Sequence, residues 1–336
     1  MKAELAEAIP GLSRIYAGTL INRAWRVVRD SALWSFQLQQ SSFASPAQVQ
    51  AGTVTVPIPP SNVIIGDATA TAAWAAVVAP PLLTQYQFRV SDYSIYNVIG
   101  YDTITYAPFA ALLLDRTFVD PVTSAPGNNY QLFQCYYAAP SPTFRRWLSV
   151  QDMVNGYALR IWGSRRDLNI LDSQRQLTTD PTDILGLGQD TRPGSATLGW
   201  PMFELWPVPT SRVSYQTWYV DEGPDLAANA DLLPSPIGED VVMLKARVYA
   251  YEWAEARRDI MAAKGAGPGY LQLMRDIEAR FDARLKTLRV NDKDVVDATM
   301  ARIDAGNQAG WGLAPWYNSG TMRAGMGWPG RGVWGW

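Results

Sequence analysis

The chain has 336 residues, with 29 lysines and arginines against 31 aspartates and glutamates, so its formal net charge of −2 implies no strongly charged partner. It contains no histidine. This absence removes the usual general base, the nucleophile systems that depend on histidine and the commonest metal ligand. A chain of this length buries a sizeable core without a metal or a disulfide, and no sequence feature calls for a cofactor.

Cys135 is the only cysteine, which excludes an intrachain disulfide, a four-cysteine zinc site and a CxxC redox pair. We expect it to be a buried, apolar thiol. Acidic residues within Met1–Glu7 argue against a secretory signal peptide. Ala68–Phe88 is uncharged and long enough to raise the question of a membrane span, but Pro80 and Pro81 argue against one, so the sequence predicts no membrane partner.

The first predicted element is a helix over Leu12–Phe36, introduced by Pro10 and Gly11. Its apolar residues recur three or four apart, as expected for one packed face: Leu12, Ile15, Tyr16, Leu20, Val27, Val28 and Ala32. The opposite side carries Arg14, Arg23, Arg26 and Arg29. We interpret these arginines as a solvated face, with a subunit or nucleic-acid contact as the alternative.

From about Ser45 to Gly223 the chain is rich in β-branched and aromatic residues, with turn formers at short intervals, which predicts an all-β region. The strand candidates are Gly52–Val56, Tyr86–Arg89, Tyr93–Val98, Thr103–Tyr106, Leu112–Phe118 and Tyr130–Tyr137. Phe203–Trp206 and Val213–Val220 are predicted to form a hairpin. Thr55–Pro60 and Ala79–Pro81 are too rich in proline for central strands, and Leu177–Gly199 is predicted to be a long loop.

Helical periodicity returns at Pro236 and continues towards Lys264. The glycine-rich break at Gly265–Gly269 separates this helix from a second one, and the two are predicted to form an antiparallel hairpin. The second helix extends to about Ala305 if it is continuous, whereas a new cap at Asn291–Asp294 would divide it.

The segment from Asn307 to Trp336 has eight glycines, five tryptophans, two arginines and no acidic residue. Glycine and proline at this density oppose regular structure, yet the indoles are too apolar to remain exposed on a free chain. We therefore predict an extended arm that binds a neighbouring subunit or another partner, with folding back onto its own domain as the alternative. Its predicted contact residues are Trp311, Trp316, Arg323, Trp328, Arg331, Trp334 and Trp336.

Motifs for chemistry are weak. Gly325–Gly330 matches the GxGxxG pattern but has no preceding strand and no room for a following helix, and the sequence has no phosphate-binding Gly-Lys-Ser/Thr loop. A carboxylate pair would suffice for glycoside hydrolysis, yet no pair stands out. Glu239, Asp240, Glu252 and Glu255 are interpreted as solvated or ion-paired residues of one helix. Arg145–Trp147 and Arg165–Arg166 are too short to indicate a nucleic-acid site.

Several short motifs follow one another in a characteristic order: Ala32-Leu-Trp-Ser-Phe36, Gly52-Thr-Val-Thr-Val56, Tyr86-Gln-Phe-Arg89, Leu112-Leu-Leu-Asp-Arg-Thr-Phe118, Phe203-Glu-Leu-Trp-Pro-Val-Pro209 and Ala250-Tyr-Glu-Trp-Ala254. Over roughly residues 12–290 this order resembles the head-to-tail adaptor (neck, or connector) proteins of tailed bacteriophages, including the related tail tubular components of short-tailed phages. Each motif is a packing motif, so the resemblance depends on their common order.

The resemblance implies an α+β protein without catalytic activity, assembled in the host cytoplasm and located in the virion neck. It implies a ring, usually of twelve copies, that docks under the portal protein, contacts tail or nozzle proteins and surrounds a channel through which genomic DNA passes without sequence-specific binding. The alternative is a β-rich phage tail or receptor-binding protein that uses its aromatic residues to bind a glycan.

Taken together, these patterns predict an α+β fold in which a helical bundle is formed by the two ends of the chain. The predicted parts are an N-terminal helix within 1–44, an inserted β domain over 45–223, a helical hairpin over 224–306 that completes the bundle, and the extended arm over 307–336.

Overall fold

The computed structural model describes residues 1–9, 11–57, 61–77, 85–91, 94–120, 127–162, 165–173, 175–192, 195–223, 225–226, 232–257 and 270–311, excepting the side chains of Asp167 and of residues 308–311. It is a mixed α+β structure with several sheets, which confirms the predicted class. The chain divides into two compact units. The helical unit comprises Met1–Gln39 and Tyr219–Asp304, and the β unit comprises Gln40–Trp218 and Ala305–Trp336.

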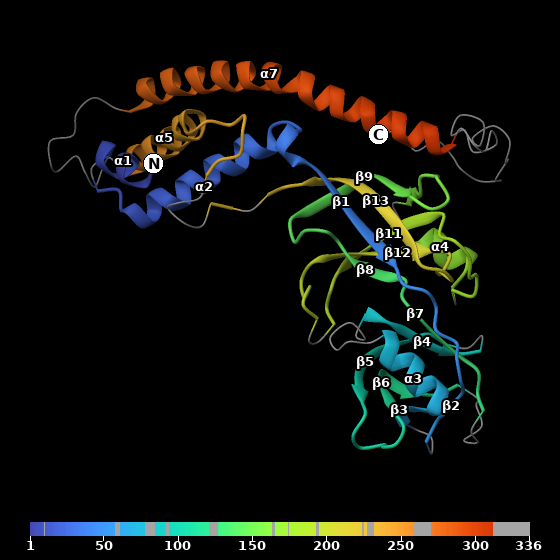
Figure 1. The fold of residues 1–336 in the computed structure, drawn as a ribbon. Helices are drawn as coiled ribbons and strands as arrows, with labels where there is room; N and C mark the ends of the chain where they lie inside the picture. Colours follow the sequence, from blue (N-terminus) through green and yellow to red (C-terminus); the bar gives the residue numbers. More distant parts are fainter. Residues whose placement is uncertain are drawn as a thin grey trace. The chain divides into compact units, whose positions relative to one another are not determined.

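The elements of the helical unit are α1 (Lys2–Ala8), α2 (Arg14–Asp30), the 3₁₀ turn η1 (Ser35–Gln37), α5 (Glu239–Ala256) and most of α7 (Leu271–Trp311). Figure 1 shows α2 and α5 running beside the first half of α7. One apolar core joins these helices, and it includes Leu5 of α1, Trp25 of α2, Val241 of α5 and Phe281 of α7. Side chains from both ends of the chain therefore exclude water together.

The first long helix is shorter than predicted. It begins at Arg14, where the Ser13 hydroxyl caps it by accepting a hydrogen bond from the Tyr16 N–H at 3.2 Å, and it ends at Asp30. The buried line follows Ala17, Leu20, Ile21, Ala24, Trp25 and Val28. The placement of Ile15 on this line is wrong: it is 88% exposed, because it lies two residues before Ala17 and so about 200° around the helix.

The second half of the helical unit is formed by α5 and α7. The helix predicted over Pro236–Lys264 is observed as α5, Glu239–Ala256, and residues 258–264 lie outside the described part. The last helix is continuous from Leu271 to Trp311, so no new cap forms at Asn291–Asp294. Its buried side chains form one stripe: Ile277, Phe281, Leu285, Leu288, Asp292, Val296 and Ile303.

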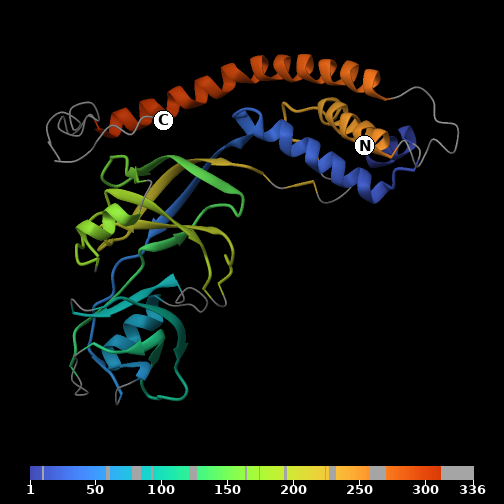
Figure 2. The same cartoon turned by 180° about the vertical axis from the view of Figure 1, so that it is seen from behind.

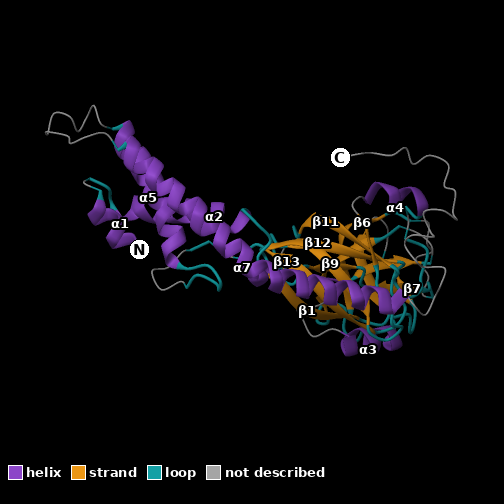
Figure 3. Cartoon of the chain, turned by 90° about the horizontal axis from the view of Figure 1, so that it is seen from above, coloured by secondary structure: helices purple, strands orange, loops and turns teal. Residues whose placement is uncertain are grey.

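The β unit contains thirteen described strands in three sheets. The strands are β1 (Leu38–Ser45), β2 (Val54–Thr55), β3 (Ser61–Gly66), β4 (Gln87–Val90), β5 (Tyr96–Asp102), β6 (Ala111–Phe118), β7 (Tyr130–Phe133), β8 (Tyr136–Ala138), β9 (Phe144–Asp152), β10 (Arg160–Trp162), β11 (Asp183–Gln189), β12 (Pro201–Trp206) and β13 (Val213–Asp221). Their orders are β1-β13-β9, β10-β11-β12-β8 and β2-β3-β6-β5-β4-β7. Two described helices accompany them, α3 (Ala68–Val77) and α4 (Arg165–Leu171), shown in purple in Figure 3.

The six-stranded sheet packs its apolar side against α3, which Figure 2 shows from behind. Ala70 and Trp74 of α3 are fully buried in this core with Phe88 and Tyr96. The helix is a correction to the prediction of an all-β region, and it occupies the start of the uncharged Ala68–Phe88 stretch. Within the described part of the chain, no helix has the length and apolar character needed to span a membrane.

Two strand predictions and one loop prediction are wrong in detail. Thr103–Tyr106 forms turns, because the Asp102 carboxylate accepts hydrogen bonds from the N–H groups of Ile104 at 2.8 Å and Thr105 at 2.9 Å. The predicted strand Tyr130–Tyr137 is divided into β7 and β8. The predicted long loop Leu177–Gly199 contains β11, which is the central partner of β10 and β12.

The predicted hairpin of Phe203–Trp206 and Val213–Val220 is also wrong, since the two strands belong to different sheets. The backbone between them bonds elsewhere: the Val208 N–H donates to the Leu177 carbonyl at 3.0 Å, and the Thr210 carbonyl accepts from the Gln48 N–H at 3.2 Å. The connecting residues therefore form a crossover from one sheet to the other instead of a turn that pairs its flanking strands.

Candidate interaction surface

The residues predicted to bind partners lie almost entirely outside the described part of the chain. Trp311 is the last residue of α7, and only its backbone is described. The structure does not describe the other six: Trp316, Arg323, Trp328, Arg331, Trp334 and Trp336. Their proposed role therefore stays a prediction.

The predicted start of the arm at Asn307 requires correction, because residues 307–311 continue α7. The Ser149 hydroxyl of β9 donates a hydrogen bond to the Asn307 side chain. Gly306 lies so close to Gln151 that a Cβ there would be 2.7 Å from the Gln151 Nε2. Glycine at 306 thus permits close packing of the helix on β9, and any separate arm begins after Trp311.

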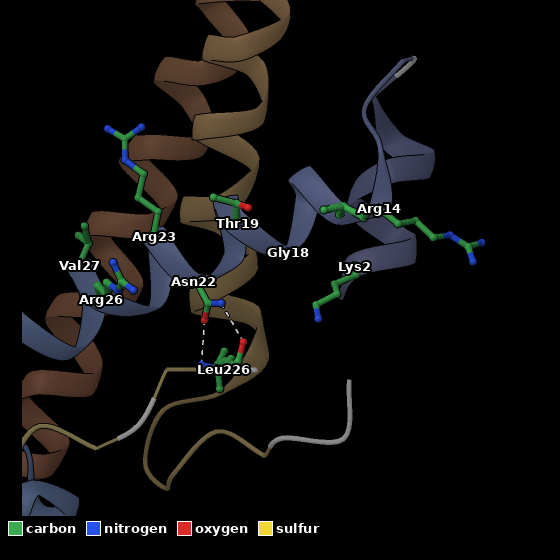
Figure 4. Close-up of a pocket in the computed structure, with 10 residues that line it drawn as sticks. Lys2, Arg14, Gly18, Thr19, Asn22, Arg23, Arg26, Val27 and Leu226 are labelled. Carbon is green, nitrogen blue, oxygen red and sulfur yellow. Dashed lines mark hydrogen bonds between the residues drawn. The ribbon is translucent and has the colours of Figure 1, made fainter. Parts of the chain in front are cut away.

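One concave surface of the described chain is a groove of about 740 Å³ along α2. We call it the α2 groove. Its lining consists of Lys2 from α1, Arg14, Ile15, Gly18, Thr19, Asn22, Arg23, Arg26 and Val27 from α2, and Leu226. Figure 4 shows the lining residues, with Asn22 of α2 bonded to Leu226. Ile15, Gly18, Asn22 and Arg26 follow one another three or four residues apart, so they lie on one helical line.

The groove is basic and partly apolar. Four of its lining residues are cationic and none is acidic. Lys2 and Arg14 form no ion pair with a described residue, whereas the Arg23 guanidinium lies 4.1 Å from the centre of the Tyr249 ring. The side chain of Lys2 packs against Gly18, because the Lys2 Cε lies 3.1 Å from the position that a Cβ would take at residue 18. The side chain of Lys2 therefore lies across the small residue in the helix.

One end of the α2 groove is filled by the chain itself. The Asn22 side-chain amide donates to the Leu226 carbonyl at 2.8 Å and accepts from the Leu226 N–H at 2.8 Å. The Arg26 guanidinium donates from Nε to the Asp225 carboxylate at 3.0 Å and forms a second, parallel bond to it. The hydrogen bond and the charge of Arg26 lower the pKa of Asp225.

Arg29 does not belong to the solvated face assigned to it. It is 7% exposed and donates to the Gly223 carbonyl at 3.2 Å, with Asp30, Glu222 and Asp225 as ion-pair partners. Arg14, Arg23 and Arg26 are exposed, as predicted. The arginine-rich side of α2 is visible in the sequence and indicates where the groove lies. The outward position of Ile15 differs from the buried position predicted for it.

A second polar cluster lies inside the β unit. Glu204 of β12 is fully buried and accepts hydrogen bonds from Arg175, while Arg165 lies 3.4 Å from it. Arg89 of β4 donates to the Arg175 carbonyl at 2.7 Å. These contacts join the six-stranded and four-stranded sheets, and we assign them a structural role because Glu204 and Arg175 satisfy each other's charge away from solvent.

The remaining candidates for chemistry are separate or inert. Burial raises the pKa of the Cys135 thiol well above its ordinary value, with a further contribution from Glu204, so the thiol is a poor nucleophile. Asp240 pairs with Arg284 at 3.0 Å, and Glu255 accepts from the Tyr270 N–H at 3.0 Å. Among the described residues, no group of three or more cysteines, aspartates and glutamates is arranged to hold a metal ion.

The aromatic residues of the β unit mainly pack against one another. Phe43 lies 4.9 Å from Tyr215 and 5.2 Å from Phe203 between ring centres, and Trp147 lies 5.1 Å from Phe203. These rings fill the space between two sheets, as side chains on facing strands do. They are therefore not arranged as an exposed platform for stacking on a sugar.

Comparison with models of known protein families gives no match to this chain, and comparison with curated proteins also gives none.

Proposed function

We propose that the chain is a structural head-to-tail adaptor of a tailed bacteriophage and has no catalytic activity. In this proposal a ring of copies, twelve by the family resemblance, docks below the portal in the virion neck, joins the capsid to the tail or nozzle proteins and surrounds the DNA channel. The helices from both chain ends form the bundle, the β domain is inserted between them, and the arm after Trp311 makes contacts with the portal or a neighbouring subunit.

The observation that carries the proposal is the shared apolar core of the chain's two ends. Trp34, from the Ala32–Phe36 motif, and Ala250 and Ala254, from the Ala250–Ala254 motif, are all buried in this core. Residues of two of the motifs on which the resemblance depends thus contribute to one apolar core, although they lie more than 200 residues apart in sequence. Their order along the chain has a physical reason, which supports the adaptor assignment over a chance resemblance.

The form of α7 also supports an assembly role. Its 41 residues bury one stripe, and much of the remaining helix surface is exposed. A helix of this length presents more surface than its own unit covers. In a ring, the exposed surface of this helix in each copy would provide the heterologous contacts with the neighbouring copies that close the ring. The near-neutral net charge of −2 is compatible with passage of DNA without its retention.

The direct test is the mass and symmetry of the assembled protein. The full chain should be examined alone and with a purified portal by mass photometry and by class averages of electron micrographs. We expect a large ring with an open channel, formed by the chain or on the portal. A closed dimer or trimer that never adds to a portal would contradict the proposal, and specific binding on a glycan array would favour the receptor-binding alternative.

A further inference from the structure

The α2 groove recognises a particular kind of segment at its closed end. The chain places Asp225 on Arg26 and binds both backbone polar groups of Leu226 with one side chain, Asn22. The Leu226 side chain then enters the apolar core. An acidic residue followed by an aliphatic one is therefore the segment that this end of the groove holds.

We call the opposite end of the groove, around Lys2, Arg14 and Ile15, its open end. It also carries cations and an aliphatic side chain. Arg14 and Lys2 supply cations that have no ion pair with any described residue, and Ile15 supplies an aliphatic side chain that is 88% exposed. Thr19 also lines the groove and supplies a hydroxyl. The exposed Ile15 side chain gives the lining an aliphatic surface, and burial of this surface against a partner's aliphatic side chain would remove apolar area from water.

We propose that the open end of the α2 groove binds an extended acidic segment with an aliphatic side chain, supplied by a partner protein. The carboxylates of that segment pair with Arg14 and Lys2, and its aliphatic side chain packs on Ile15. The choice of occupant follows from charge complementarity, because Lys2 and Arg14, the two lining cations that have no carboxylate or aromatic partner among the described residues, attract carboxylates and repel basic segments. The inference rests on the proposed adaptor function, since it specifies the chemistry of the docking partner.

The test uses the full chain and a fluorescein-labelled peptide, Asp-Glu-Gly-Pro-Asp-Leu, which repeats the chain's own residues 221–226. Anisotropy titrations at low ionic strength compare it with a peptide in which lysine replaces the three acids. The double variant Arg14→Glu/Ile15→Asp alters only exposed residues of the groove. Its matched control, Arg289→Glu/Val290→Asp, makes the same charge reversal and replaces another exposed aliphatic residue with aspartate on α7.

We expect saturable binding of the acidic peptide, at least tenfold weaker in the groove variant, unchanged in the α7 control and weakened by salt. Equal binding of the lysine peptide, equal loss in the control, or no saturable binding would overturn the inference. Self-association that the groove variant abolishes would show that the occupant is a second copy, which also overturns it. A chain that forms rings on portals without binding the peptide would refute only this inference, whereas peptide binding without ring assembly would refute only the adaptor function.

Discussion

Asp292, in the middle of α7, accepts two hydrogen bonds from Ser35, one from the backbone N–H at 2.7 Å and one from the hydroxyl at 2.5 Å. The two residues are 257 positions apart in sequence. Asp292 is 4% exposed, and it occupies a polar position in an otherwise apolar stripe. A buried carboxylate of this kind is tolerated because its partners replace water, and it fixes which turn of α7 faces the end of the N-terminal segment.

We therefore expect Asp292→Ala to lower the free energy of unfolding by about 1–3 kcal/mol, because it leaves two donors of Ser35 without their acceptor. Chemical denaturation of the full chain measures this change. Asp294→Ala is the matched control, since Asp294 is exposed on the same helix and its substitution should change stability by less than about 0.5 kcal/mol. Equal losses in the two variants would show that the Ser35 contact contributes nothing specific.

The same position shows what the sequence could and could not predict. Residues Asn291–Asp294 have the composition of a helix cap, so a break in the helix was a reasonable alternative. The helix continues through these residues, and the Asp292 carboxylate accepts hydrogen bonds from Ser35, a residue that is distant in sequence. Local pattern determines where a helix can begin, but it does not show which distant donors compete for a capping side chain.

The periodicity of apolar residues indicates whether most segments are helices or strands. It does not predict which strands pair with one another across long sequence distances. The β region is recognisable from its alternating residues, as in β13, where Val213, Tyr215 and Thr217 are buried in turn. The sheet to which each strand belongs depends on contacts with segments such as Leu177, which no local rule identifies. The α2 groove was missed for a similar reason, since the exposed position of Ile15 depends on which face of α2 meets α5.

Gly52 provides a second test of local geometry. Its φ of +84° lies in the left-handed region, and a Cβ there would overlap both the Ala70 backbone N and the Asp67 Oδ1. Asp67 caps α3 by accepting from the Ala70 N–H at 2.7 Å, and it also accepts from the Thr53 N–H at 2.9 Å. Gly52→Ala should therefore displace the capping carboxylate as well as strain the backbone.

Gly199→Ala is the control for this substitution, because Gly199 has nearly the same positive φ, +83°, but no atom lies within 4 Å of the position that a Cβ would take there. We expect Gly199→Ala to cost about 1 kcal/mol from backbone conformation alone. Gly52→Ala should cost about 1–3 kcal/mol more, from crowding. Thermal and urea unfolding of both variants measure the difference, and similar losses would mean that α3 adjusts to the added methyl group.

The environment of the Asp190 carboxylate should make the free energy of unfolding depend on pH. Burial of its carboxylate acts to raise the pKa, but hydrogen bonds from Arg192, Ser195 and Thr197 outweigh burial and lower the pKa well below its ordinary range. A carboxyl whose pKa is lowered by folding stabilises the folded state above its unfolded pKa of about 4. That contribution is lost as the pH falls from there towards the folded pKa.

Asp190→Asn should consequently be less stable than the unchanged chain at neutral pH, and the difference should shrink below about pH 4. Urea unfolding from about pH 2.5 to about pH 7 brackets this transition and measures the difference. The exposed Asp297→Asn is the control that should show no such trend. A difference that stays constant across this range would contradict the assigned role of the Asp190 charge.

The last prediction concerns the glycine- and tryptophan-rich arm, whose start is now placed after Trp311. Glycines allow a backbone to follow the groove of another protein, and each indole supplies a large apolar surface with one donor. The arm's own sequence contains no acid that could pair with Arg323 or Arg331, so we expect these two arginines to pair with acids or carbonyls of a partner.

A truncation after Trp311 keeps the Ser149–Asn307 contact and the whole of α7, whereas a truncation after Gly306 removes both the contact and the last helical residues. The protein truncated after Trp311 should have the same free energy of unfolding as the full chain. It should nevertheless lose stable attachment to the portal, because several buried indoles contribute on the order of several kcal/mol per arm and a ring multiplies this through avidity. Co-sedimentation with portals and the yield of infectious particles measure attachment, and denaturation measures the fold. Normal yield from the protein truncated after Trp311 would show that the arm is dispensable, and a loss of stability in that protein would show that the arm belongs to its own fold.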